Sequence, residues 1–165
     1  MTDLRIAFFG SPDFAVPTLE ALIGSSYRPT VVVTQPDRPT GRGRELQPPP
    51  VKPVAEAVGI DVLQPEHLRE SDAVSAFTKY APDLSIIVAY GQILPPSVLQ
   101  VPAHGTLNVH ASLLPRWRGA SPIQAAILAG DAETGSTIML VDETEDHGPT
   151  LAQRPEPIRA DDDAG

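Results

Sequence analysis

The stretch Leu84-Ser85-Ile86-Ile87-Val88-Ala89-Tyr90 decides the fold class of this chain. Its nearly continuous apolar character is typical of a strand that is covered on both faces, as in a parallel sheet. Outward from it, strand and helix signals alternate along the sequence. The expected strands are 4–9, 30–34, 61–63, 84–90, 106–112, 137–141 and 151–153, and the expected helices are 14–23, 51–58, 72–80 and 122–129. This order predicts an α/β fold with a mostly parallel sheet and helices on both faces.

A proline-rich segment, residues 35–50, interrupts this alternation. Proline lacks a backbone N–H and restricts φ, so we expect an extended loop here. Long loops inside compact domains are usually functional or disordered. This one carries Arg38, Arg42 and Arg44, and arginine is suited to phosphate contacts. Taken alone, the Gly-Arg-Gly-Arg run at 41–44 is more typical of a solvated, flexible turn than of a phosphate-binding loop.

Composition narrows the class of protein further. The chain has 165 residues, 41% hydrophobic and 20% charged, as in one soluble globular domain. It has no cysteine, which excludes disulfides and thiolate zinc sites. The sequence also lacks the usual histidine and carboxylate metal motifs, so we expect no metal. No apolar run is long enough to span a bilayer, and we expect a cytoplasmic protein that does not contact membranes.

The negative charge of the chain lies mostly in its last part. Residues 1–130 carry 10 basic and 11 acidic side chains, whereas residues 131–165 carry 2 basic and 10 acidic side chains. We interpret the acidic part as a solvated surface. The net charge of −9 therefore does not exclude a nucleic-acid partner for the nearly neutral remainder.

Asn108 and His110 form the most informative polar pair. Alternate side chains of an extended strand leave the same face, so these two project together. The Leu-Leu-Pro at 113–115 ends the strand, which places the pair at its carboxyl end, where open α/β sheets bind ligands. An amide donor beside a titratable base suits acyl transfer, in which an oxyanion is held and a proton is moved. A purely structural role is equally compatible with these two residues alone.

A carboxylate after a later strand favours the catalytic alternative. Asp146 lies in the turn Glu145-Asp146-His147-Gly148-Pro149. Brought close to His110, it would orient the imidazole ring. Amide, imidazole and carboxylate together suit proton transfer around a tetrahedral intermediate. The set contains no serine or cysteine nucleophile, so the attacking group would belong to a substrate.

Over essentially its whole length the chain resembles the N-terminal catalytic domain of the methionyl-tRNA formyltransferases. The resemblance is carried by the motifs Ile6–Phe14, Gln35–Gly43, Val88–Pro95, Asn108–Pro115, Arg118–Ile123 and Gly130–Gly135. The Asn-X-His and Ser-Leu-Leu-Pro block marks the wider formyl-transferring folate family, which also contains a glycinamide ribonucleotide enzyme and a sugar-nucleotide enzyme. The arginine-bearing loop singles out the tRNA member, because small acceptors need no such arm.

The resemblance implies a Rossmann-like formyltransferase fold. It also implies transfer of a formyl group from 10-formyltetrahydrofolate to the α-amino group of methionyl-initiator tRNA, in translation initiation. By the same resemblance, Asn108, His110 and Asp146 are catalytic. The implied folate-contacting positions are Ser112, Leu113, Leu114, Pro115, Gln92, Ile93, Leu94, Asp142, Glu143 and Thr144, and the implied tRNA-contacting positions are Arg38, Arg42 and Arg44.

Two departures from the family pattern qualify these expectations. Where relatives usually have Leu-Asp-Thr-Gly, this chain has Glu145-Asp146-His147-Gly148, which adds charge beside the expected acid. Full-length family members are also much longer and end in a β-barrel domain that binds tRNA. We therefore expect residues 1–165 to be a monomeric catalytic domain, incomplete at its C-terminal end, with low or no activity alone. The alternative is a non-catalytic folate- or RNA-binding remnant.

Overall fold

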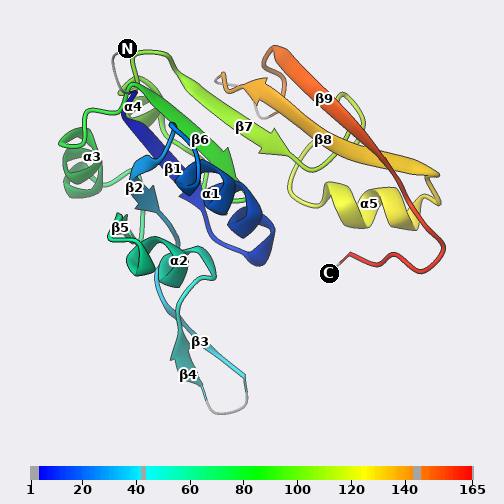
Figure 1. Cartoon of the computed structure of the whole chain (residues 1–165), viewed down its shortest axis with the longest axis horizontal. Helices are drawn as coiled ribbons and strands as arrows, with labels where there is room; N and C mark the ends of the chain where they lie inside the picture. Colours follow the sequence, from blue (N-terminus) through cyan, green and yellow to red (C-terminus); the bar gives the residue numbers. More distant parts are fainter. Residues whose placement is uncertain (1–3, 42–43, 143–145, 165) are drawn as a thin grey trace. The chain divides into compact units, whose positions relative to one another are not determined.

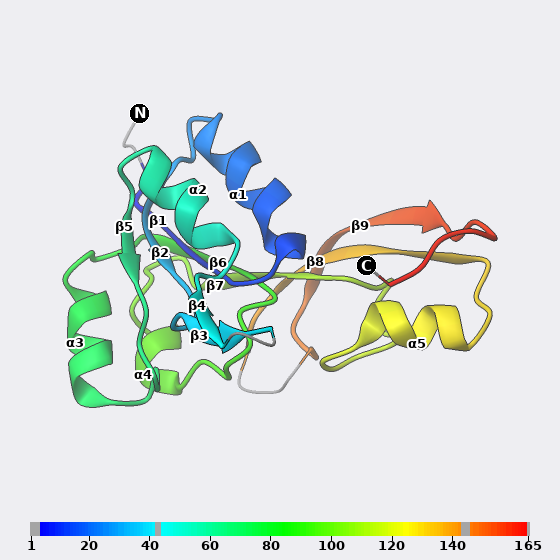
Figure 2. The same ribbon diagram turned by 90° about the horizontal axis from the view of Figure 1, so that it is seen from below.

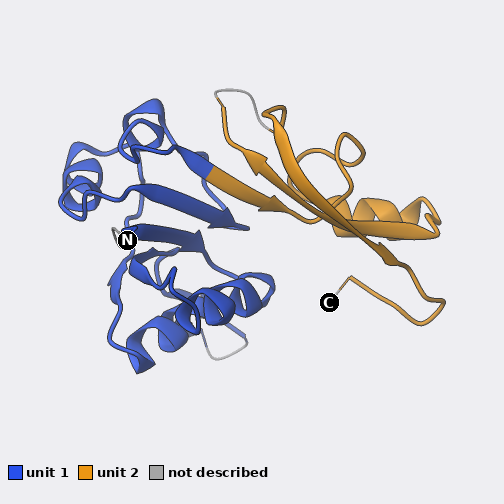
Figure 3. Ribbon diagram, turned by 45° about the horizontal axis from the view of Figure 1, so that its top comes forward, with its two compact units in different colours: residues 1–106 blue, residues 107–165 orange. Residues whose placement is uncertain are grey.

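The computed structural model describes residues 4–41, 44–142 and 146–164, and it divides the chain into two compact units. Unit 1 comprises residues 1–106 and unit 2 comprises residues 107–165 (Figure 3). In the described ranges, each helix is too short or too polar to cross a membrane.

Parallel strands form the centre of unit 1, in the order β5-β2-β1-β6 (Figure 1). Their bounds are β1 Ile6–Gly10, β2 Pro29–Val33, β5 Asp61–Leu63 and β6 Leu84–Val88. Every residue of β1 is buried, because the strand pairs with β2 on one side and with β6 on the other. The stretch that decides the fold class thus lies beside the innermost strand of this unit.

Helices cover both faces of this sheet (Figure 2): α1 and α2 pack together on one face, and α3 and α4 on the other. The helices are η1 Asp13–Ala15, α1 Val16–Ile23, α2 Val51–Ala57, α3 Ser71–Thr78 and α4 Pro96–Leu99. On the α3 face, the Phe9 ring meets Phe77 and Tyr90 edge-on, with centroid separations of 5.2 and 5.5 Å. The predicted α/β class, with parallel strands between two helical layers, is confirmed.

The proline-rich segment differs from the extended loop predicted for it. It contains an antiparallel hairpin of β3 (Arg38–Thr40) and β4 (Glu45–Gln47), whose residues are all exposed. Proline is tolerated there because each strand of a two-stranded ribbon has one unpaired edge. The missing proline N–H breaks no hydrogen bond when it would have faced that edge. At the hairpin base, the Lys52 ammonium lies 2.8 Å from the Asp37 carboxylate, which also accepts a hydrogen bond from Gln64.

Unit 2 is built on an antiparallel ribbon in the order β7-β8-β9. Strand β7 (Thr106–His110) begins at the last residue of unit 1 and is followed by helix α5 (Pro122–Leu128). Strands β8 (Glu133–Leu140) and β9 (Thr150–Pro157) are both longer than predicted. All eight residues of β9 are exposed, so this strand lacks the apolar pattern by which its length could have been recognised.

Candidate active site

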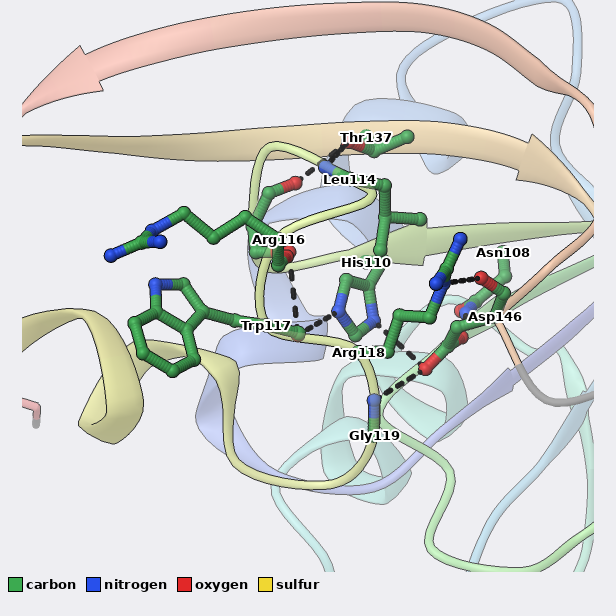
Figure 4. A network of polar contacts seen from close by, with 10 residues as sticks. Asn108, His110, Leu114, Arg116, Trp117, Arg118, Gly119, Thr137 and Asp146 are labelled. Carbon is green, nitrogen blue, oxygen red and sulfur yellow. Dashed lines mark hydrogen bonds and ion pairs between the residues drawn. The ribbon is translucent and has the colours of Figure 1, made fainter.

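Asn108, His110 and Asp146 come together at the end of β7 (Figure 4). The Asn108 amide Nδ2 lies 3.3 Å from Asp146 Oδ1, and His110 Nδ1 lies 3.5 Å from Asp146 Oδ2. The Asp146 and His110 side chains are only 9% and 7% exposed. The predicted triangle of amide, imidazole and carboxylate therefore exists in unit 2, and alternation along β7 aims its first two members at one carboxylate.

The Asp146 carboxylate is held by the loop that follows β7. The backbone N–H of Gly119 donates to Asp146 Oδ2 at 2.9 Å, and Arg118 Nε donates to the Asp146 backbone oxygen at 3.0 Å. Asp146 itself has a φ of 52°, a left-handed conformation that aspartate adopts more readily than most residues. One donor thus fixes the Asp146 carboxylate beside the imidazole, and the other fixes the Asp146 backbone.

The His110 ring is engaged at both nitrogens. Its Nε2 lies 2.9 Å from the backbone oxygen of Trp117. A carbonyl oxygen only accepts, so Nε2 must carry a hydrogen, and Nδ1 is the nitrogen that faces Asp146. Because both neighbours are acceptors, the ring can also hold a second proton with a partner for each N–H.

Asn108 keeps donor capacity beyond its bond to the carboxylate. A carboxamide has two N–H hydrogens, and the bond to Asp146 uses one of them. The side chain is half-buried and belongs to the middle residue of β7. The second hydrogen suits an oxyanion, since a fixed amide donor is one of the groups that stabilise such a charge.

The turn 112–115 is fixed by polar contacts that sequence reasoning missed. The buried Ser112 hydroxyl donates to the Arg116 backbone oxygen at 2.6 Å. The Thr137 hydroxyl donates to the Ser112 backbone oxygen at 2.7 Å and accepts from the Leu114 N–H at 3.1 Å. Gln153 Nε2 donates to the Leu114 oxygen at 2.8 Å. No sequence signal could have found Thr137, because its place opposite His110 depends on the register between β7 and β8, which cannot be read from sequence.

Three further predicted folate positions, Gln92, Ile93 and Leu94, lie in unit 1. Gln92 accepts from the Leu68 N–H at 3.0 Å and donates to the Glu66 oxygen at 3.2 Å, so its amide is engaged with the protein. Ile93 is 86% exposed, whereas Leu94 is buried. Apolar contact with a ligand at this position is therefore available from Ile93 and not from the buried Leu94.

The remaining predicted positions divide between described and undescribed residues. Arg38 is paired with Glu66 at 2.8 Å, and Arg44 is exposed at the hairpin turn. Asp142 is exposed after β8. Arg42, Glu143 and Thr144 lie outside the described residues. Within the described ranges, no group of histidine and acidic side chains is arranged to hold a metal ion, and the expected absence of a metal stays a prediction.

Comparison with known proteins identifies the family of this chain. The chain matches the formyl transferase family over residues 4–165 and belongs to it. The methionyl-tRNA formyltransferase of Halorhodospira halophila is 59% identical over 98% of the chain, and that of Methylococcus capsulatus is 54% identical over 96%. Each alignment covers 52% of the relative. The chain therefore spans about half the length of the curated relatives it matches.

Solved structures support the same fold. The phosphoribosylglycinamide formyltransferase of Bacillus halodurans superposes with a TM-score of 0.78 at 24% identity, covering 97% of this chain and 83% of that one. A formyltetrahydrofolate deformylase of Pseudomonas syringae gives a TM-score of 0.75 at 22% identity, covering 99% and 54%. The formyltransferase fold predicted from the motifs is confirmed.

Proposed function

We propose that this chain is the catalytic domain of a methionyl-tRNA formyltransferase. It would transfer the formyl group of 10-formyltetrahydrofolate to the α-amino group of methionyl-initiator tRNA, in the cytoplasm, as a monomer. The juxtaposition of Asn108, His110 and Asp146 carries the proposal, because it supplies an oxyanion donor and a proton-handling ring without a protein nucleophile. The high identity to methionyl-tRNA formyltransferases supports this acceptor over a small one.

In the proposed reaction, the neutral amine of the methionyl group attacks the formyl carbon. A new C–N bond forms, and the carbonyl oxygen becomes an oxyanion that accepts a hydrogen bond from Asn108. His110, oriented by Asp146 on Nδ1 and by the Trp117 carbonyl on Nε2, stabilises that charge and takes part in moving the amine proton to N10 of the folate. The C–N10 bond then breaks, giving formylmethionyl-tRNA and tetrahydrofolate.

The surrounding segments would supply the substrate contacts. We assign the turn 112–115, the exposed Ile93 and the segment 142–144 to the folate. Because the Ser112 hydroxyl and the backbone groups of Ser112 and Leu114 described above are used internally, the turn would contact the folate mainly through the Leu113 side chain. The hairpin β3–β4 would contact the tRNA through Arg42 and Arg44, of which Arg44 lies at the described end of its turn, while Arg38 pairs with Glu66.

Substitution of Asn108 or His110 by alanine tests the proposal. We expect kcat to fall by about 10²–10³ for Asn108→Ala and about 10²–10⁴ for His110→Ala, because each removes a group that acts in the transition state. Folate affinity, measured by thermal shift or calorimetry, should change little. The matched control is His67→Ala, which removes an exposed imidazole from unit 1.

The assay should offer competing acceptors together with the donor. We expect charged initiator tRNA to be formylated. We expect glycinamide ribonucleotide and an amino-sugar nucleotide to remain unformylated. Wild-type turnover in either alanine variant would contradict the assigned roles. Transfer only to a small acceptor would replace the proposed substrate. Folate binding without any transfer, both in this chain and in a full-length version of it, would favour the non-catalytic alternative.

A further inference from the structure

Asp131, which follows α5, holds two side chains of the loop after β7. Its Oδ2 accepts hydrogen bonds from Trp117 Nε1 at 2.7 Å and from Arg116 Nε at 2.8 Å, and its Oδ1 accepts one from Arg116 Nη2 at 2.6 Å. The guanidinium carbon lies 4.4 Å from the centroid of the Trp117 ring. The carboxylate thus locks a planar guanidinium and an indole together in one geometry.

The backbone of the same loop is what reaches His110. Trp117 has a φ of 57°, a left-handed conformation that a bulky side chain rarely adopts without support from its surroundings. In this conformation its carbonyl oxygen lies 2.9 Å from His110 Nε2 and 3.4 Å from the Ser112 hydroxyl. The hydrogen bond from the indole to Asp131 restrains the Trp117 side chain from a distant part of the sequence.

The Asp131 carboxylate is more buried and more firmly anchored than the carboxylate of an ordinary surface ion pair. Asp131 is only 15% exposed, although Arg116 is 58% exposed. The Arg116 and Trp117 hydrogen bonds lower the pKa of Asp131 to about 2, so the carboxylate is charged throughout the neutral range. The Asp131 N–H also donates to the Ala126 oxygen at 3.1 Å, which anchors the residue to the end of α5.

We propose that Asp131 is a positioning residue for the imidazole of His110. By fixing Arg116 and Trp117, it keeps the Trp117 carbonyl against Nε2, and this contact sets the ring orientation and leaves Nδ1 toward Asp146. Without the contact, rotation about the Cβ–Cγ bond would place Cδ2 where Nδ1 faces Asp146 and Cε1 where Nε2 faces Trp117, so both polar contacts of the ring would be lost. The positioning of the His110 ring by Asp131 is independent of the proposed function. Only the expected effect on kcat rests on the proposed function.

The test compares Asp131→Asn and Trp117→Phe with a chemically matched control. Trp117→Phe keeps an aromatic ring for Arg116 but removes the N–H that Asp131 binds. The control is Asp83→Asn, because Asp83 binds the Arg5 guanidinium in the same two-point manner, at 3.1 and 2.9 Å, in unit 1. Circular dichroism establishes that each variant is folded.

The primary readout is the pair of ring ¹⁵N resonances of His110 at fixed pH, assigned with His110→Gln. We expect both unit 2 variants to shift these resonances and Asp83→Asn to leave them unchanged. In Asp131→Asn, the single indole N–H resonance should move as well, which reports that the Asp131 contact has weakened. In the formyl-transfer assay, kcat should fall about tenfold to a hundredfold, with the KM for the formyl donor nearly unchanged.

Unchanged His110 resonances in a folded Asp131→Asn variant whose indole signal has moved would overturn the inference. An equal shift in Asp83→Asn would overturn it too. The ¹⁵N measurement does not require an active enzyme. If the parent chain failed to transfer formyl groups, that result would count against the proposed function. The His110 resonances would still decide the role of Asp131.

Discussion

At the scale of single residues, the Arg5–Asp83 pair has a direct consequence for acid stability. The Arg5 side chain donates to the Asp83 carboxylate at 3.1 and 2.9 Å, and the Arg5 backbone N–H donates at 2.8 Å. These bonds lower the pKa of Asp83 from 3.8 to about 2. A carboxyl group with a depressed pKa stabilises the folded state above its unfolded pKa, and this contribution is lost as the pH falls through the folded pKa.

We therefore expect Asp83→Asn to unfold at a lower temperature than the parent chain at pH 6, with the difference shrinking between pH 4 and pH 2 as Asp83 is protonated. Thermal unfolding followed by circular dichroism measures this. Glu66→Gln is the control, because both side chains of the Arg38–Glu66 pair are more than half exposed and the pair contributes little. A difference that stayed constant down to pH 2 would contradict the expectation.

The candidate site shows which residue contacts a sequence can predict. Asn108 and His110 were predictable as a pair because alternation in a strand is a local rule. The place of Asp146 after a later strand made it a candidate partner for His110, and the resemblance to the family implied that the two lie together. The Trp117 carbonyl and the Thr137 hydroxyl were not predictable, because a backbone oxygen carries no sequence signature and the register of β8 depends on tertiary pairing.

At the scale of elements, the β3–β4 hairpin is the part of the fold that was predicted wrongly from the sequence. Proline density indicated an extended loop, yet the strands pair from Arg38 opposite Gln47 to Thr40 opposite Glu45. Gly41 and Arg44, with φ values of 66° and 50°, are left-handed residues at the two described ends of the reversal. The hairpin was invisible to hydrophobic periodicity because none of its strand residues is buried.

The hairpin supplies a test of the proposed acceptor. We expect Arg44→Ala to weaken the use of initiator tRNA on the order of tenfold, the cost of one charge-assisted phosphate contact, and to leave folate binding unchanged. Steady-state kinetics with varied tRNA and calorimetry with folate measure the two effects. Arg154→Ala, which removes an exposed arginine from β9, is the control. Equal losses for tRNA and folate, or equal losses in the control, would exclude the assigned contact.

At the scale of the whole molecule, the aromatic residues report separately on the two units. The three tyrosines, Tyr27, Tyr80 and Tyr90, all lie in unit 1, and the single tryptophan, Trp117, lies in unit 2. Strand β7 begins in unit 1 and continues into unit 2, so its disruption affects both. Tyrosine and tryptophan signals can therefore show whether the chain unfolds in one step.

Phe77→Ala is the variant that makes this comparison informative. Phe77 is fully buried and packs edge-on against Phe9, so its truncation should lower the free energy of unfolding by about 3–5 kcal/mol. We expect the tyrosine and tryptophan transitions in urea to move to lower denaturant together. A tryptophan transition that kept its parent midpoint, while the tyrosine transition moved, would show that unit 2 unfolds independently.

The outer strand β9 affects how copies of this chain meet in solution. An exposed strand edge is a template on which a neighbouring polypeptide can lengthen the sheet. Pro155 and Pro157 have no N–H to offer an incoming strand, and Arg154 and Glu156 put charge between and beside them. Half of this strand therefore resists recruitment into shared sheets and fibrils, which favours a chain that stays dispersed at high concentration.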